Sequence, residues 1–236
     1  MEKLVHALPA VVMFILVAGM FTLVFTVSSR GRRKDRQTGQ GYVQLARDAA
    51  ERGWTYEART KGRIDGYSGL RPFPASGLNL TACHYTTGLF RGRAFKYFEY
   101  RFMSPMSGTD ANRQPQLRSV FIVEAPGPGA FMQILRLNML DRLFDRREST
   151  PLGEPAFDKS FRVITDDEAF TRNALRHGLM PYLLTEPLAD KTSLQLHDGE
   201  LFTWYTGPLT PQMTDEKLSY LCDVLDRIPT HVWSAA

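Results

Sequence analysis

The sequence predicts an α+β protein with one N-terminal transmembrane helix and a single cytoplasmic domain, in which helices pack on a mainly antiparallel sheet. Three observations support this prediction. Residues 7–27 carry no charge, residues 30–36 are strongly basic, and the rest of the chain mixes strand-like and helix-like patterns. A chain of 236 residues, 43% hydrophobic and 23% charged, can bury a sizeable core, which excludes a disordered or collagen-like protein.

The uncharged run at residues 7–27 has the length of a membrane span. As a helix it would reach about 31 Å, which matches one hydrocarbon core. Twelve of its residues are Leu, Ile, Val or Phe, so insertion is favoured by about 5 kcal/mol before Gly, Thr and Pro subtract from that sum. A cleaved signal peptide is the alternative, but its apolar run is usually shorter and ends at an Ala-x-Ala-like site. We therefore predict a short extracytoplasmic tail at residues 1–6 and a transmembrane helix at residues 7–27.

The span is followed by a basic juxtamembrane linker, residues 28–41, whereas the N-terminal tail has only Glu2 and Lys3 as charged residues. The positive-inside rule then places the N-terminus outside and the domain in the cytoplasm of a single-pass plasma-membrane protein. Two cysteines 139 residues apart, without a Cys-x-x-Cys motif, agree with a reducing compartment. The linker is either a topology signal alone or also a surface for anionic lipid headgroups, at about 1 kcal/mol per basic residue. Its basic residues are Arg30, Arg32, Arg33, Lys34 and Arg36.

The charge of the domain excludes one class of partner. The net charge of the whole chain is +4, but residues 37–236 contain 23 Lys and Arg against 23 Asp and Glu. A nucleic-acid-binding domain carries a basic surplus that displaces counterions from phosphates. We therefore expect no nucleic acid among the partners.

The soluble domain, residues 42–236, opens with a helix and a strand. Apolar residues recur at helical spacing from Tyr42 until Gly53, and Trp54–Arg59 then alternates apolar with polar residues. The density of Gly, Pro and Ser from Thr60 to Gly77 predicts a loop.

A hairpin gives the clearest strand signal. Its arms are Leu78–Phe90 and the aromatic Ala94–Phe102, joined by the three residues Arg91-Gly92-Arg93. Aromatic residues occupy both faces of the second arm, so both faces should be covered. A loop is expected over residues 104–116.

Three segments follow in the middle of the chain. Leu117–Ala125 reads as a strand that ends at Pro126-Gly127-Pro128-Gly129. Residues 130–147 fit both a helix and a strand, and we expect a strand followed by a short helix. After a loop at residues 148–154, Phe157–Thr165 is predicted to be a strand.

The last third combines helices with a second hairpin. Thr165 and Glu168 have the spacing of a capping box before a helix that runs to about Arg176, with Gly178 available to end it. Further elements are a short helix at Met180–Leu184, a hairpin with a type I′ turn at Asp198-Gly199 and a helix that Thr210-Pro211 opens and Pro229 closes.

The pattern Phe157-Asp158-x-x-Phe161-x-Val163, followed by Asp166-Asp167 and a helix, resembles a bacterial membrane-anchored family with a domain of unknown function. The resemblance extends loosely from about Trp54 to Trp233. It implies the architecture given above and a prokaryotic source. No activity is attached to the family, so the resemblance implies no catalytic residue.

No residue set in the sequence has the spacing of a catalytic, cofactor or metal site. The acidic residues before the helix are expected at a helix start because of its dipole. Ser68 lacks the second glycine of a nucleophile elbow. Cysteine and histidine residues do not form the close pairs of a zinc site, and Cys83 and His84 should face opposite sides of a strand. The residues weighed in this way were Asp166, Asp167, Glu168, Cys83, His84, His177, His197 and Cys222.

Together these features favour a membrane-anchored cytoplasmic binding or scaffold domain without enzymatic activity, with a protein partner and the lipid bilayer as its contacts. The alternative is a membrane-tethered enzyme whose active site has no recognisable motif.

Overall fold

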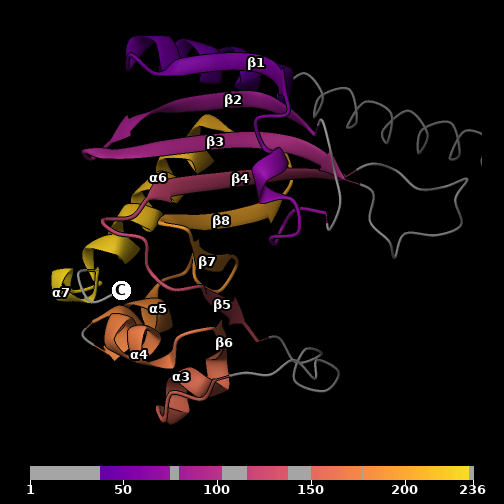
Figure 1. The fold of residues 1–236 in the computed structure, drawn as a ribbon. Coiled ribbons are helices and arrows are strands. Elements are labelled where there is room, and N and C mark those ends of the chain that lie inside the picture. Colours follow the sequence, from indigo (N-terminus) through magenta and orange to yellow (C-terminus); the bar gives the residue numbers. More distant parts are fainter. Residues whose placement is uncertain (1–37, 75–79, 103–115, 138–149, 177, 234–236) are drawn as a thin grey trace, which may run out of the picture. The chain divides into compact units, whose positions relative to one another are not determined.

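The computed structural model describes residues 38–74, 80–102, 116–137, 150–176 and 178–233. In these ranges, the compact unit that begins at Gln44 contains one eight-stranded sheet in the order β1-β2-β3-β4-β8-β7-β5-β6, with every neighbouring pair antiparallel (Figure 1). The predicted α+β fold with an antiparallel sheet is confirmed. The strands are β1 (Thr55–Lys61), β2 (Thr81–Phe90), β3 (Arg93–Phe102), β4 (Gln116–Glu124), β5 (Met132–Arg136), β6 (Phe161–Thr165), β7 (Ser193–His197) and β8 (Glu200–Thr206).

The predicted transmembrane helix at residues 7–27 and the basic linker up to Arg36 lie outside the described residues, so both stay predictions. Within the described ranges, none of the helices combines the length and the apolar character that crossing a bilayer requires.

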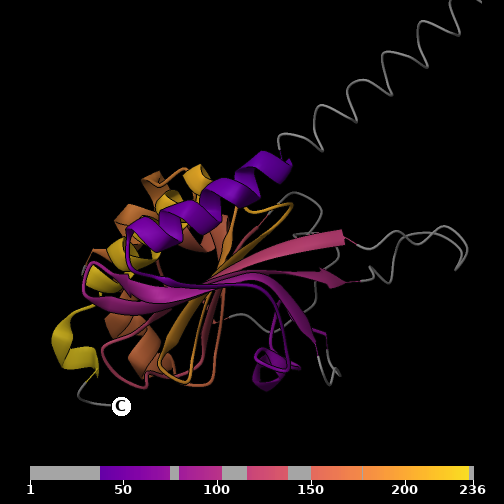
Figure 2. The same ribbon diagram turned by 90° about the horizontal axis from the view of Figure 1, so that it is seen from above.

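One face of the sheet is covered by helices (Figure 2). The longest of them, α6 (Pro211–Asp226), contacts β3, β4 and β8. Its residues Leu218, Leu221 and Leu225 are buried, as is Ile228 just after the helix. Helix 38–51 contributes the buried side chains of Leu45 and Ala49. The remaining helices are α3 (Pro155–Ser160), α4 (Glu168–Arg176), α5 (Leu179–Thr185) and α7 (Thr230–Trp233).

The opposite face of β2, β3 and β4 is covered by residues 62–74, which include the 3-10 helix η1 (Asp65–Tyr67). Phe73 of this segment stacks on Tyr100 of β3 and on Tyr67, with both pairs of ring centroids 5.2 Å apart. Buried Phe98 and Val120 belong to the same cluster. Both faces of the aromatic strand are therefore covered, as its sequence predicts.

Both predicted hairpins form. The β7–β8 turn is Asp198-Gly199, with φ angles of 49° and 73°, as a type I′ turn requires. The β2–β3 turn is shorter than predicted, because Phe90 pairs with Arg93. Only Arg91 and Gly92 remain in the turn, with φ angles of 52° and 79°.

The prediction of one strand over Phe157–Thr165 is wrong in its first half. Pro155 starts helix α3, and the strand β6 begins only at Phe161. Asp158 stabilises the turn before this helix, because its carboxylate accepts hydrogen bonds from the backbone N–H groups of Leu152 and Gly153, both at 3.0 Å. Phe157 and Phe161 stack with their ring centroids 4.9 Å apart. A spacing of four residues suits one helical turn as well as an alternating strand, so the pattern that predicted a strand is equally compatible with a helix.

Helix α4 forms where predicted, but Thr165 is not its cap. Asp167 accepts the hydrogen bond of the Phe170 N–H at 2.9 Å, which is the N-cap interaction. Thr165 instead donates to the Phe131 carbonyl at 2.7 Å and accepts from the Asp167 N–H at 3.1 Å. The strand predicted after residue 130 is β5, whereas the short helix predicted after it lies outside the described residues.

Candidate functional site

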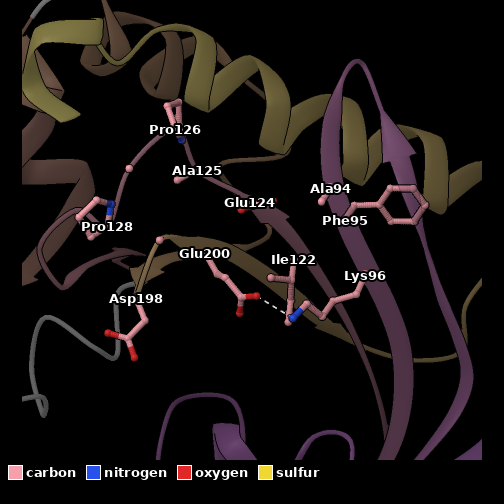
Figure 3. A pocket seen from close by; sticks show the side chains of 12 residues that line it. Ala94, Phe95, Lys96, Ile122, Glu124, Ala125, Pro126, Pro128, Asp198 and Glu200 are labelled. Carbon is pink, nitrogen blue, oxygen red and sulfur yellow. Dashed lines mark ion pairs between the residues drawn. The ribbon is translucent and has the colours of Figure 1, made fainter. Parts of the chain in front are cut away.

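A polar cavity of about 550 Å³ lies where β4 ends beside the β7–β8 turn (Figure 3). Four elements line it: the first residues of β3, the last residues of β4, the Pro-Gly segment after β4 and the β7–β8 turn. The lining residues are Ala94, Phe95, Lys96, Ile122, Glu124, Ala125, Pro126, Gly127, Pro128, Asp198, Gly199 and Glu200.

Close backbone packing holds one wall of this cavity in place. The Gly199 N–H donates to the Pro128 carbonyl, and the Ala125 N–H donates to the Gly199 carbonyl, both at 2.7 Å. Gly129 has a φ of 58°, and a Cβ atom there would lie 2.8 Å from Leu196 Cδ2. This segment therefore needs glycine at position 129, both for its backbone conformation and for its contact with the sheet.

A triad of Lys96, Tyr67 and Glu200 lies beside the cavity. Lys96 Nζ is 2.6 Å from Glu200 Oε1 and donates a hydrogen bond to the Tyr67 hydroxyl, also at 2.6 Å. The Tyr67 hydroxyl in turn donates to Glu200 Oε2 at 2.8 Å. Figure 3 shows the Lys96 and Glu200 side chains pointing toward each other. Lys96 is opposite Ile122, and Glu200 is opposite Glu124, so the ion pair spans β4 diagonally.

The triad keeps Lys96 protonated. Burial by itself would lower the pKa of Lys96, but the hydrogen bonds to Glu200 and Tyr67 and the charge of Glu200 outweigh burial and raise it. Burial and the Glu200 carboxylate also raise the pKa of the Tyr67 hydroxyl, against the opposing effect of Lys96. Lys96 thus acts as a fixed cation rather than as a base or a nucleophile.

The cavity lining contains three carboxylates and one ammonium group, so its formal charge is negative. Glu200 is engaged with Lys96, whereas Asp198 at the turn is 88% exposed. Asp198 lies 3.3 Å from His197, and Glu124 lines the cavity from the end of β4. This lining suits hydrogen-bond donors and positively charged groups.

The residues singled out in the sequence do not meet in this cavity. The predicted membrane-surface residues Arg30, Arg32, Arg33, Lys34 and Arg36 lie outside the described residues, as does His177. Asp167 caps α4, and Ser68 donates to the Pro74 carbonyl at 3.3 Å. Cys222 is buried in α6.

Cys83 and His84 lie at an irregularity that the sequence does not show. The register of β2 against β3 shifts between Cys83 and Thr86, and His84 has a φ of 53°. Nδ1 of His84 lies 2.7 Å from the Tyr56 hydroxyl. The simple alternation expected for Cys83 and His84 therefore does not apply here. In the described part of the chain, no three His, Cys, Asp or Glu residues come together in a way that would hold a metal ion.

Lys96, Tyr67 and Glu200 form no recognisable motif in the sequence. The one local signal was a lysine inside an otherwise aromatic strand, since Lys96 shares its face with Phe98 and Tyr100. Its partners are 29 residues earlier and 104 residues later in the chain, and nothing local indicates them.

A scan of protein-family models finds no match for this sequence, and a search of curated proteins finds none either. Among solved structures, the chain is similar to the crystal structure of the mycobacterial trehalose monomycolate transport factor A, TtfA. The TM-score is 0.52 at 16% sequence identity, over 82% of this chain and 97% of that chain. At this identity the similarity shows that the two proteins share a fold. The family resemblance drawn from the Phe157–Val163 pattern stays a prediction.

Proposed function

We propose that this chain is a membrane-anchored accessory protein of a transport system, and that its domain binds a partner protein rather than catalysing a reaction. One observation carries the proposal: the shared fold extends over 97% of TtfA, a protein whose name describes a transport factor. The uncharged run at residues 7–27 supports attachment to the membrane.

The polar cavity is the place on the domain where we expect contact with the partner. Its lining is negative and includes the exposed Asp198, so it suits a basic or hydroxyl-bearing group. A membrane-tethered enzyme is the alternative function, and a polar cavity is the feature that would favour it. Against this alternative, the cation beside the cavity, Lys96, is held by Glu200 and Tyr67 and is not free to transfer a proton.

The basic residues Arg30, Arg32, Arg33, Lys34 and Arg36 complete the proposal. They would hold the linker against anionic headgroups of the cytoplasmic leaflet. The domain would then lie close to the cytoplasmic side of a membrane transporter.

Site-specific photo-crosslinking in living cells tests this function. A photoreactive residue at Asp198 lies at the rim of the cavity, and one at Gln212, exposed on α6, is the matched control. We expect the Asp198 probe to crosslink to an integral membrane transport protein, identified by mass spectrometry, and the Gln212 probe not to do so. The crosslink should disappear when residues 1–36 are deleted.

Two results would contradict the proposal. One is the same set of crosslinks from both positions. The other is turnover of a small molecule by the purified chain that is lost when Lys96 is replaced by Met, because this result would point to the enzyme.

A further inference from the structure

A second cavity, of about 370 Å³, lies on the sheet face opposite the helices, and it shares no lining residue with the cavity described above. Residues 69–71, which follow η1, form one wall, and the strands β5, β6 and β7 supply the rest together with Phe131, just before β5. Its volume falls within the range of small-molecule sites. The lining residues are Gly69, Leu70, Arg71, Phe131, Gln133, Ile164 and Gln195.

Two buried glutamines lie side by side in this cavity wall. Gln133 of β5 and Gln195 of β7 are opposite each other in the antiparallel register. They are 3% and 1% exposed, and Gln133 Nε2 donates to Gln195 Oε1 at 3.0 Å. Their neighbours Met132, Ile134 and Leu194 point to the helix-covered face and are ordinary core residues.

The amide nitrogen of Gln195 has no hydrogen-bond partner among the described residues. Leaving a buried N–H group without an acceptor costs free energy, and proteins seldom retain such a group where an apolar residue would fit. Gln195 also lines the cavity, so an acceptor group on a bound ligand would be placed to complete its hydrogen bonds. This unpartnered N–H group in the cavity wall is the observation on which the inference of a ligand rests.

The chemistry of the wall selects the kind of ligand. Gln195 supplies an uncharged N–H donor, and Gln133 adds a carbonyl oxygen. A neutral amide or hydroxyl group matches this pair, because it accepts from one side chain and donates to the other. Leu70, Phe131 and Ile164 form apolar surface around the pair. We propose that this cavity binds a small uncharged ligand with a carbonyl or hydroxyl group next to an apolar chain.

The test uses three probes of equal size and different charge: hexanamide, hexanoate and hexylammonium. The full chain is placed in nanodiscs of neutral lipid, empty nanodiscs serve as the blank, and binding is measured by saturation-transfer NMR. We expect saturable binding of hexanamide and binding of both ions that is weaker by about ten-fold or more, the effect of one mismatched hydrogen bond at a buried site. Arg71 also lines the cavity, so hexanoate is the critical comparison.

Two variants link this binding to the glutamines. The double variant Gln133→Leu/Gln195→Leu should lose at least about ten-fold in hexanamide affinity, while its melting temperature stays equal or rises because no polar group is left unpaired. Ile164→Phe fills the cavity without changing the amides and should cause the same loss. Gln212→Leu, on the exposed side of α6, is the control and should bind as the parent does.

Three outcomes would overturn the proposal. The first is the absence of saturable hexanamide binding to the parent protein. The second is hexanoate binding as tight as hexanamide binding, which would make the site anionic in its preference. The third is unchanged hexanamide affinity in the Ile164→Phe variant.

Discussion

Two lysines of the domain have opposite environments. Lys96 is surrounded by Glu200 and Tyr67, whereas Lys217 in α6 is 1% exposed, and burial lowers its pKa from 10.5 to about 8. Glu216 and Glu186 raise this pKa and Lys191 lowers it, but burial has the largest effect. Lys96 therefore stabilises the fold as a cation, whereas the charge of Lys217 opposes folding.

Replacing Lys217 by Met should stabilise the protein by about 1–3 kcal/mol at pH 7, because Met keeps the apolar stem and removes the buried charge. Between pH 8 and 10.5 the unfolded lysine binds more protons than the folded one, so the contribution of Lys217 to stability rises with pH across this interval. The stability difference between the parent and Lys217→Met should thus shrink from pH 7 to 9.5 in urea titrations. A difference that stays constant over this range would contradict the assigned pKa.

Replacing Lys96 by Met should destabilise the domain by about 1–3 kcal/mol, because the half-buried carboxylate of Glu200 loses its cation. The double variant Lys96→Met/Glu200→Gln should recover most of this loss. Arg63→Met is the control, since its ion pair with Glu57 is exposed and should contribute under about 1 kcal/mol. Equal effects of Lys96→Met and Arg63→Met on the urea midpoint would show that the triad stabilises the fold no more than an exposed ion pair does.

At the scale of the elements, the segment from α3 to β6 differs from its sequence prediction and contributes aromatic side chains to the core. Phe157 and Phe161 are both buried and stack on each other, and the Arg136 guanidinium lies 4.9 Å from the centre of the Phe161 ring. Asp167, by contrast, acts through one cap hydrogen bond at the surface. Neither feature is part of the candidate site.

Phe161→Ala should therefore cost about 3–5 kcal/mol of unfolding free energy, as expected for a buried aromatic side chain. Asp167→Asn should cost well under about 1 kcal/mol, because Asn caps a helix as well as Asp does. Melting temperatures of both variants, with and without millimolar magnesium or calcium, provide the measurement. If a metal stabilises the parent and this effect vanishes in Asp167→Asn, the residue belongs to a cation site and not to a cap.

At the scale of the whole molecule, the predicted arrangement in the membrane rests on the N-terminal sequence alone. The predicted span and the basic linker both precede the domain in the sequence. The domain itself is formally neutral. From this pattern, the positive-inside rule predicts that the domain lies in the cytoplasm.

A reporter fused to the C-terminus should accordingly be active in the cytoplasm. Changing Arg30, Arg32, Arg33, Lys34 and Arg36 to Gln should weaken or scramble this orientation, because the difference in positive charge across the span is lost. Alkaline phosphatase fused to the C-terminus provides the opposite readout, since it is active only outside the cytoplasm. Phosphatase activity from the unmodified chain would refute the topology.

The sequence by itself determined the local elements wherever short-range physics decides them. Asp198-Gly199 adopts the positive φ angles of its turn because few other residue pairs do so readily. Thr210 and Pro211 start α6 because one caps the helix and the other lacks the N–H that a first turn leaves unpaired. Local patterns predicted the wrong element at Phe157, because its spacing from Phe161 suits both a strand and a helix. They predicted the wrong N-cap for α4, because two residues that can cap a helix, Thr165 and Asp167, lie close together.

The tertiary structure alone decided which strands are neighbours and therefore where the sites lie. Placing β8 between β4 and β7 brings Tyr67 to Glu200, 133 residues away in the chain, and pairing β5 with β7 joins Gln133 to Gln195. The order and register of distant strands depend on how both faces of the whole sheet are buried, and no short segment contains that information. For this reason the antiparallel sheet could be predicted from the sequence, whereas both candidate sites appeared only in the folded chain. The membrane anchor stays a prediction.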